Sequence, residues 1–152
     1  MYKKLSSKGF TLIELLIVII IIGILAAIAF VAYSGATNKA HQAAAQSTLA
    51  EVKNKLAEYY ADHGSYPQAG ASGSTTQNVD YWLAGTEGGN NTTMSQTFTD
   101  ANGYTYATSG PTGCGDTVSS AGVVTAGTTA CTGFTLTATT QAAPNGAITI
   151  TN

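Results

Sequence analysis

The chain has 152 residues, enough for one modest domain, and only 9% of them are charged, against about 25% in typical globular domains. There is no arginine, and all six lysines lie at or before Lys55, so the rest of the chain carries no lysine or arginine. Phosphate backbones are bound by clustered lysine and arginine side chains. The composition therefore argues against direct nucleic-acid binding by the C-terminal part, and none is expected.

The first element in chain order is a basic stub, Met1–Gly9, followed by an apolar stretch from Phe10 to Ala32. As a helix this stretch would be about 34 Å long, slightly more than the hydrocarbon core of a bilayer. Three lysines in the stub place its end in the cytoplasm and everything after Ala32 outside, by the positive-inside rule. The sequence predicts a single membrane span with a cytoplasmic N-terminus.

One carboxylate, Glu14, lies near the start of the apolar stretch. An ionised glutamate costs roughly 2.5 kcal/mol or more at the centre of a bilayer, so it needs a partner. The lone carboxylate is the main feature that a plain membrane anchor does not explain.

The helical pattern continues beyond the span to about Asp62. This stretch contains no proline, and glycines are its only helix-disfavouring residues. Apolar residues then recur at helical spacing at Leu49, Val52, Leu56 and Tyr59/Tyr60, which predicts a helix that is apolar along one stripe only. The run Asp62-His63-Gly64 predicts the end of the helix, with the glycine in a left-handed cap. We expect lipid or other subunits to cover the first half of this helix.

The second half is rich in threonine and glycine and predicts β-structure. Thr97–Tyr106 alternates around Asn102-Gly103 and predicts a hairpin, whereas Thr132–Thr140 and Ala147–Thr151 predict a second pair of strands. The expected fold class is α+β, with the long N-terminal helix packed on a C-terminal antiparallel sheet. Residues 68–96 are expected to be loop.

Within residues 68–96, the stretch around Val79–Leu83 is the exception, because it could form a short regular element.

Both cysteines, Cys114 and Cys131, lie beyond the predicted span and would face an oxidising space. A disulfide between them contributes up to roughly 3 kcal/mol in the chain-entropy model. Two free buried thiols are the alternative.

The residues Lys8-Gly9-Phe10-Thr11-Leu12-Ile13-Glu14 closely resemble the start of the type IV pilin family, which includes the pseudopilins of type II secretion. The resemblance is dense through about residue 32, and the plan of one helix followed by strands covers the whole chain. It implies that a prepilin peptidase cuts between Gly9 and Phe10 and that the new amine of Phe10 is N-methylated. It also implies that Glu14 pairs with the N-terminal ammonium of a neighbouring subunit.

The resemblance and the helical pattern together predict four segments. These are a cleaved leader (1–9), a hydrophobic transmembrane and assembly helix (10–33), an amphipathic helix (34–63) and a β-rich globular domain (64–152). The chain would lie in the cytoplasmic membrane as a precursor and in a surface pilus after assembly. Its implied partners are other copies of itself, the peptidase, membrane lipid, and an assembly ATPase with its membrane platform, because the chain has no phosphate-binding loop of its own.

One residue departs from the family pattern. Many pilins carry a proline where this chain has Val31, and their helix can lose hydrogen bonds between that proline and a glycine equivalent to Gly23. Without the proline, no backbone donor is removed. The continuity of this helix in a filament is therefore left open by the sequence.

Other interpretations compete with that of a pilus subunit serving adhesion, twitching or DNA uptake. Ala27-Ile-Ala29 is an acceptable signal-peptidase site, but a glutamate inside a signal core is atypical. An uncut anchor on a monomeric surface protein is a second alternative. A pseudopilin, whose short filament drives secretion, is a third and shares the same motif.

No catalytic set, cofactor site or metal site is predicted. His41 and His63 are 22 residues apart on one predicted helix, roughly 33 Å, so they cannot share a metal within one subunit. Asp80, Asp100 and Asp116 lie in loop-like stretches and are too scattered to indicate calcium, which takes six to eight oxygen ligands. We expect a structural protein rather than an enzyme.

Overall fold

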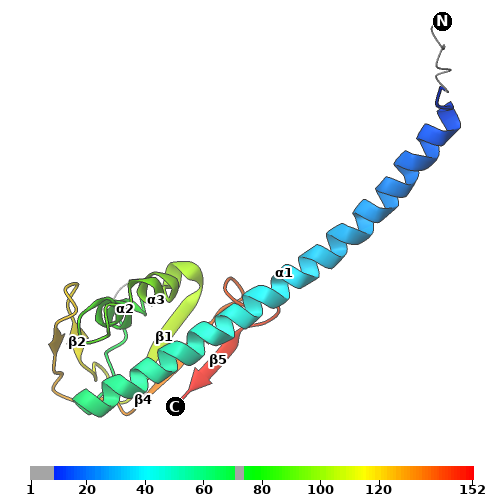
Figure 1. The fold of residues 1–152 in the computed structure, drawn as a ribbon. Coiled ribbons are helices and arrows are strands. Elements are labelled where there is room, and N and C mark those ends of the chain that lie inside the picture. Colours follow the sequence, from blue (N-terminus) through cyan, green and yellow to red (C-terminus); the bar gives the residue numbers. More distant parts are fainter. Residues whose placement is uncertain (1–8, 71–73) are drawn as a thin grey trace, which may run out of the picture. The chain divides into compact units, whose positions relative to one another are not determined.

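The computed structural model describes residues 9–70 and 74–152, so most of the predicted leader (residues 1–8) lies outside the described residues. The chain divides into two compact units, Met1–Thr37 and Asn38–Asn152, and the second is called the head below. The longest element is α1 (Leu12–His63), a single helix of 52 residues whose residues belong to both units (Figure 1).

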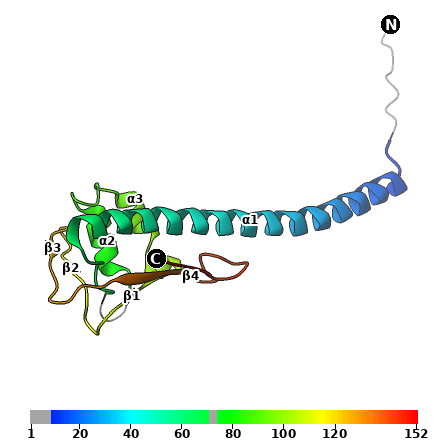
Figure 2. The same cartoon turned by 90° about the horizontal axis from the view of Figure 1, so that it is seen from below.

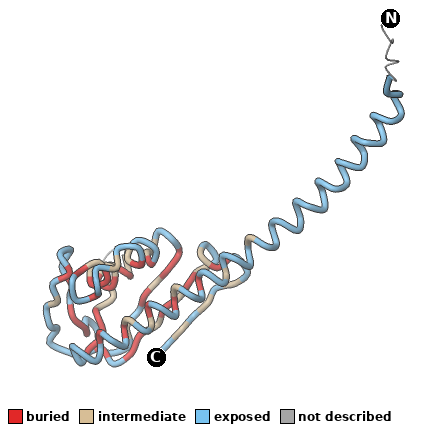
Figure 3. Tube along the Cα trace, in the orientation of Figure 1, coloured by how far each residue is buried: buried red, intermediate tan, exposed pale blue. Residues whose placement is uncertain are grey.

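In the N-terminal unit, every described residue from Gly9 to Ala36 is exposed (Figure 3). These side chains are almost all apolar, and large ones such as Ile17 and Leu25 remain 50% and 61% exposed. The unit contains one helix that is long and apolar enough to cross a membrane, with a mean hydropathy of 3.4 over its most apolar window. Nothing within the described chain covers this surface.

In the head, α1 is amphipathic as the sequence predicts. Its buried residues follow one face at spacings of three and four, and they are Ala45, Leu49, Val52, Leu56 and Tyr59. Tyr60, on the neighbouring face, is 38% exposed. The helix ends at His63, and Gly64 follows with φ at 70°, which confirms the predicted left-handed cap.

The sheet of the head has three antiparallel strands in the order β1 (Tyr104–Ser109), β4 (Gly133–Ala138) and β5 (Ile148–Thr151), seen from a second direction in Figure 2. A separate two-stranded ribbon pairs β2 (Thr117–Val118) with β3 (Val124–Thr125). The predicted pairing of the last two strands is confirmed, with Leu136 opposite Ile150.

The side chains of β4 alternate as predicted. Phe134, Leu136 and Ala138 are buried, and the threonines between them are half-buried. Together with the α1 stripe they belong to one apolar cluster. The predicted fold class, a long N-terminal helix with an antiparallel sheet, is confirmed.

The predicted hairpin over Thr97–Tyr106 is wrong. Thr97 ends the short helix α3 (Thr92–Thr97), a 3₁₀ turn η1 (Asp100–Asn102) follows, and only β1 is a strand. Asn91 caps α3, because its side-chain oxygen accepts a hydrogen bond from the Met94 amide at 3.0 Å. Asn102-Gly103 does turn the chain, but it ends η1 instead of joining two strands.

The expectation of loop over residues 68–96 is also corrected. The segment holds α2 (Gln77–Ala84) and most of α3, which pack against each other and beside α1 in the head (Figure 1). Val79, Trp82 and Leu83 are buried on α2, and the ring of Trp82 meets that of Tyr59 edge-on at 5.1 Å. The short element expected around Val79–Leu83 is therefore a helix.

Cys114 and Cys131 form a disulfide, which confirms the predicted bond and excludes two free thiols. Both cysteines are buried. The segment that follows α1 lies against them, since the Tyr66 amide donates to the Cys131 carbonyl at 3.2 Å and the Cys131 amide donates to Ser65 Oγ at 3.0 Å. These two hydrogen bonds thus hold the disulfide against the segment immediately after α1.

Candidate processing and assembly site

The predicted processing residues precede α1. Gly9 and Phe10 are exposed and lie outside any helix or strand, and α1 begins two residues later at Leu12. A Cβ placed on Gly9 would meet no atom within 4 Å, and its φ does not lie in the left-handed region that favours glycine. The fold of the described residues therefore gives no reason for a glycine at this position.

Thr11 and Glu14 form a capping box at the start of α1. The Glu14 carboxylate accepts from the Thr11 amide at 2.8 Å, and the Glu14 amide donates to Thr11 Oγ1 at 3.2 Å. The Thr11 hydroxyl also donates to the same carboxylate oxygen, Oε2, at 2.8 Å. Helix donors that have no partner in the first turn are satisfied in this way.

The capping box is a role of Glu14 that the sequence reasoning missed. Its signal, threonine followed three residues later by glutamate before an apolar run, is present in the sequence at Thr11 and Glu14. The box gives the carboxylate two donors from its own chain, which offsets part of the cost of placing it among apolar groups. It occupies Oε2 only, and among the described residues Oε1 has no hydrogen-bond partner.

The helix passes through Gly23 without interruption in this single chain. Beyond Val31 the side chains hydrogen-bond back to the helix, with Ser34 Oγ donating to the Val31 carbonyl at 3.0 Å and Thr37 Oγ1 donating to the Ser34 carbonyl at 3.0 Å. Such bonds bend helices slightly without breaking them. Position 31 is a valine and not a proline, so its backbone amide is available, which agrees with the continuous helix seen here.

The two predicted groups of site residues lie in different units. Gly9, Phe10 and Glu14 are consecutive or one turn apart at the start of the N-terminal unit, whereas Cys114 and Cys131 are buried in the head. In residues 9–70 and 74–152, no group of three or more histidine, cysteine, aspartate or glutamate side chains could hold a metal ion.

Asp116 in particular has structural partners. Its carboxylate accepts from the Tyr59 hydroxyl at 3.0 Å and from the Gly127 amide at 2.9 Å, and it is buried. This bond links α1 to the disulfide-closed segment.

Comparison with known proteins points to one class. The prokaryotic N-terminal methylation motif matches residues 4–30, which contain Gly9, Phe10 and Glu14. A fimbrial protein of Neisseria meningitidis serogroup A is 44% identical over 73 residues, which are 48% of this chain and 43% of the relative. The N-terminal part of the chain is similar to fimbrial proteins and type IV pilins.

Two further relatives are similar to this chain. The type IV major pilin protein PilE1 of Neisseria gonorrhoeae is 48% identical over 65 residues, covering 43% of this chain and 39% of PilE1. The fimbrial protein EcpC of Eikenella corrodens is 39% identical over 98 residues, covering 59% of this chain and 64% of EcpC. The pilin-like chain thus spans less than half the length of the Neisseria relatives it matches. A comparison with solved structures finds no match.

The names of these relatives are those of fimbrial and pilin proteins. The matches over 60 to 73 residues cover less than half of this chain. The methylation motif itself lies wholly within the first 30 residues, where the sequence places the cleavage and assembly residues.

Proposed function

We propose that this pilin-like chain is the structural subunit of a type IV pilus filament. The observation that carries the proposal is an apolar helix start that buries none of its described side chains and yet carries one carboxylate, Glu14. An exposed apolar surface of this extent requires lipid or protein to cover it. Lipid leaves the carboxylate unpaired with any cation, whereas neighbouring copies of the chain can supply one.

Processing would create that cation. A prepilin peptidase would cut between Gly9 and Phe10 on the cytoplasmic side of the membrane, and the new amine of Phe10 would be N-methylated. The exposure of both residues before α1 supports this step, because a protease needs an extended and accessible segment. The lack of any structural need for glycine at Gly9 supports it as well, since a narrow cleft in the peptidase would then be the reason for the glycine.

Glu14 would pair with the Phe10 ammonium of a neighbouring subunit in the filament. The capping box supports the geometry of this pairing, because it fixes the carboxylate through Oε2 and leaves Oε1 for a partner. A charge pair away from water forms only when both groups are present and well placed. Such a pair would also set the axial register, since it is satisfied at one stagger only.

Before assembly, the chain would be a single-pass protein of the cytoplasmic membrane with its N-terminus in the cytoplasm. Extraction and polymerisation would be driven by a pilus assembly ATPase acting through a membrane platform. The head, which carries no lysine or arginine after Lys55, would form the outer surface of the filament. Adhesion, twitching motility and DNA uptake are the activities proposed for such a filament.

The experiment that tests this function is mass spectrometry of the subunit in surface material sheared from cells that express the chain, together with negative-stain imaging. We expect filaments whose subunit begins with N-methylated Phe10. Full-length protein starting at Met1 and confined to the membrane would contradict the proposal and indicate a monomeric tethered protein. A processed subunit that forms no surface filaments, with a secretion defect when its gene is deleted, would indicate a pseudopilin instead.

A further inference from the structure

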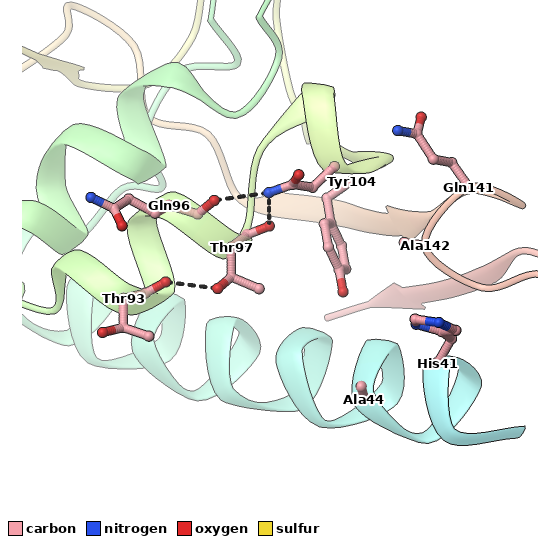
Figure 4. A pocket seen from close by; sticks show the side chains of 9 residues that line it. His41, Ala44, Thr93, Gln96, Thr97, Tyr104, Gln141 and Ala142 are labelled. Carbon is pink, nitrogen blue, oxygen red and sulfur yellow. Dashed lines mark hydrogen bonds between the residues drawn. The ribbon is translucent and has the colours of Figure 1, made fainter. Parts of the chain in front are cut away.

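The head contains a cavity of about 350 Å³ that the pilus function does not use (Figure 4). It lies between α1, α3 and the loop that follows β4, and all of its lining residues belong to the head. Its volume is at the lower end of the roughly 300–1,000 Å³ typical of small-molecule sites.

The lining of the cavity combines polar and apolar side chains. It includes three side-chain amides (Gln96, Asn102 and Gln141), the Tyr104 phenol and the imidazole of His41. Among these lining residues, which all lie in the described part of the chain, none carries a carboxylate or an ammonium group. A phosphate would find no lysine or arginine here and a metal ion no carboxylate, whereas a neutral ligand with hydroxyl groups would find both donors and acceptors.

A close backbone approach at Gly103 builds the cavity. Gly103 has φ at 83°, and a Cβ on it would lie 2.8 Å from both Gln141 Cβ and Thr139 Oγ1. The Gly103 carbonyl accepts from the Thr139 amide at 2.7 Å, which closes the loop after β4 onto the start of β1. Only glycine permits this approach, and it brings Gln141 beside Asn102 in the cavity wall.

Hydrogen bonds fix two of the amides. The Asn102 side chain donates to the Gln96 carbonyl at 2.8 Å and the Thr97 carbonyl at 3.1 Å, and the Gln141 side chain donates to the Ala101 carbonyl at 2.8 Å. Polar groups that are held in place lose little conformational entropy when a ligand binds.

Two further groups are left without partners. Within residues 9–70 and 74–152, neither the Tyr104 hydroxyl nor the exposed His41 imidazole has a hydrogen-bond partner from the protein. Tyr104 is only 5% exposed, and its ring points toward α1, with the hydroxyl on the side of His41 and Ala44 (Figure 4). The Tyr104 hydroxyl is not a buried atom, so it and the exposed His41 imidazole are both accessible to a ligand in the cavity.

We propose that this cavity binds a neutral saccharide unit. Its hydroxyl groups would exchange hydrogen bonds with Tyr104, His41 and the amides, and its apolar C–H face would pack against the Tyr104 ring and the Ala44 methyl. The site belongs to the folded head and is independent of filament assembly. A binding failure and an assembly failure are thus distinguishable.

The test is ligand-observed NMR titration of the detergent-solubilised full chain and of sheared filaments with glucose, galactose, N-acetylglucosamine and lactose. We expect at least one of them to bind the solubilised chain at millimolar or lower concentration. Ala44→Leu fills the cavity from an exposed helix position and should weaken binding more than tenfold. Tyr104→Phe removes one hydroxyl and should weaken it about fivefold, the effect of one hydrogen bond.

Each variant has a matched control. Ala43→Leu adds the same side chain to the neighbouring exposed position of α1 outside the cavity, and Tyr60→Phe removes a hydroxyl elsewhere on that helix. Both should bind as the wild type does. Binding of none of the four sugars, equal weakening by Ala43→Leu and Ala44→Leu, or tighter binding of glucose 6-phosphate than of glucose would overturn the proposal.

Discussion

The two units of this chain share one helix but differ in how its apolar side chains are covered. In the head, α1 buries one stripe of side chains against the sheet and α2, and Leu56 is fully buried. In the N-terminal unit the same helix is apolar on every side and buries nothing, with Leu25 61% exposed. The head therefore carries its own hydrophobic core, whereas the N-terminal unit depends on other molecules to cover it.

Substitution of one leucine in each unit should give the largest difference in the stability of the head. Leu56→Ala removes a fully buried side chain and should destabilise the head by about 3 kcal/mol, because it leaves a cavity in the core. Leu25→Ala, on the same helix, should leave the free energy of unfolding of the head within about 0.5 kcal/mol of wild type, since it contacts no described core residue. Near-ultraviolet circular dichroism of the detergent-solubilised chain during heating measures both effects. Equal destabilisation by the two variants would contradict the claim that only the head part of α1 contributes to the hydrophobic core.

The disulfide should matter to the head alone. Replacing Cys114 and Cys131 together by alanine should destabilise the head by roughly 3 kcal/mol, because the unfolded chain loses its cross-link. The melting temperature should fall by roughly 10 °C for a head of this size. Peptidase cleavage at Gly9, measured as the shift to the processed mass, should be unchanged. A processing defect as large as the stability defect would show that the two units are coupled.

A smaller, pH-dependent effect is expected at Asp80 on α2. Burial, together with the charge of Asp100 and against a hydrogen bond from Thr76, raises the pKa of Asp80 to about 7 from its usual 3.8. The unfolded chain therefore releases this proton at lower pH than the head does, and stability is lost as the pH rises from about 4 to 7. The side chain is only half-buried, so solvent screens part of this effect.

Asp80→Asn removes the titration and provides the measurement. The variant should match the wild type near pH 4 and exceed it in stability by about 1 kcal/mol at pH 8, judged from urea unfolding at both pH values. A variant that is less stable at pH 8 than the wild type would show that the Asp80 carboxylate stabilises the head.

Local patterns were sufficient to predict the parts of the head in which neighbours in the sequence determine the structure. The stripe containing Leu49 and Leu56, the cap at Gly64 and the pairing of β4 with β5 all follow from spacing and turn residues. The disulfide followed from there being only two cysteines on the outer side of the predicted span.

The elements that sequence reasoning missed depend on contacts between distant segments. Tyr104 in β1 pairs with Ala138 in β4, 34 residues later. The alternating pattern after Asn102-Gly103 therefore does form a strand, but that strand pairs with a distant segment and not with the residues just before the turn. Trp82 lies on a helix because its ring packs against Tyr59 of α1, which no local pattern in a glycine-rich stretch indicates. At the site, the Thr11–Glu14 capping box was readable from the sequence and was overlooked because the carboxylate was considered only as a charge.

The central claim is that the charge of Glu14 acts in assembly and not only as a helix cap. Glu14→Gln tests this most directly, because glutamine retains the capping box but removes the charge, whereas Glu14→Ala removes both. Glu51→Gln, at an exposed position of α1 in the head, is the matched control. The measurement is the yield of sheared filaments relative to processed subunit in the membrane. We predict that Glu14→Gln and Glu14→Ala reduce this ratio alike, by more than tenfold, while Glu51→Gln does not. Wild-type filament yield from Glu14→Gln would contradict the claim and leave Glu14 with a capping role alone.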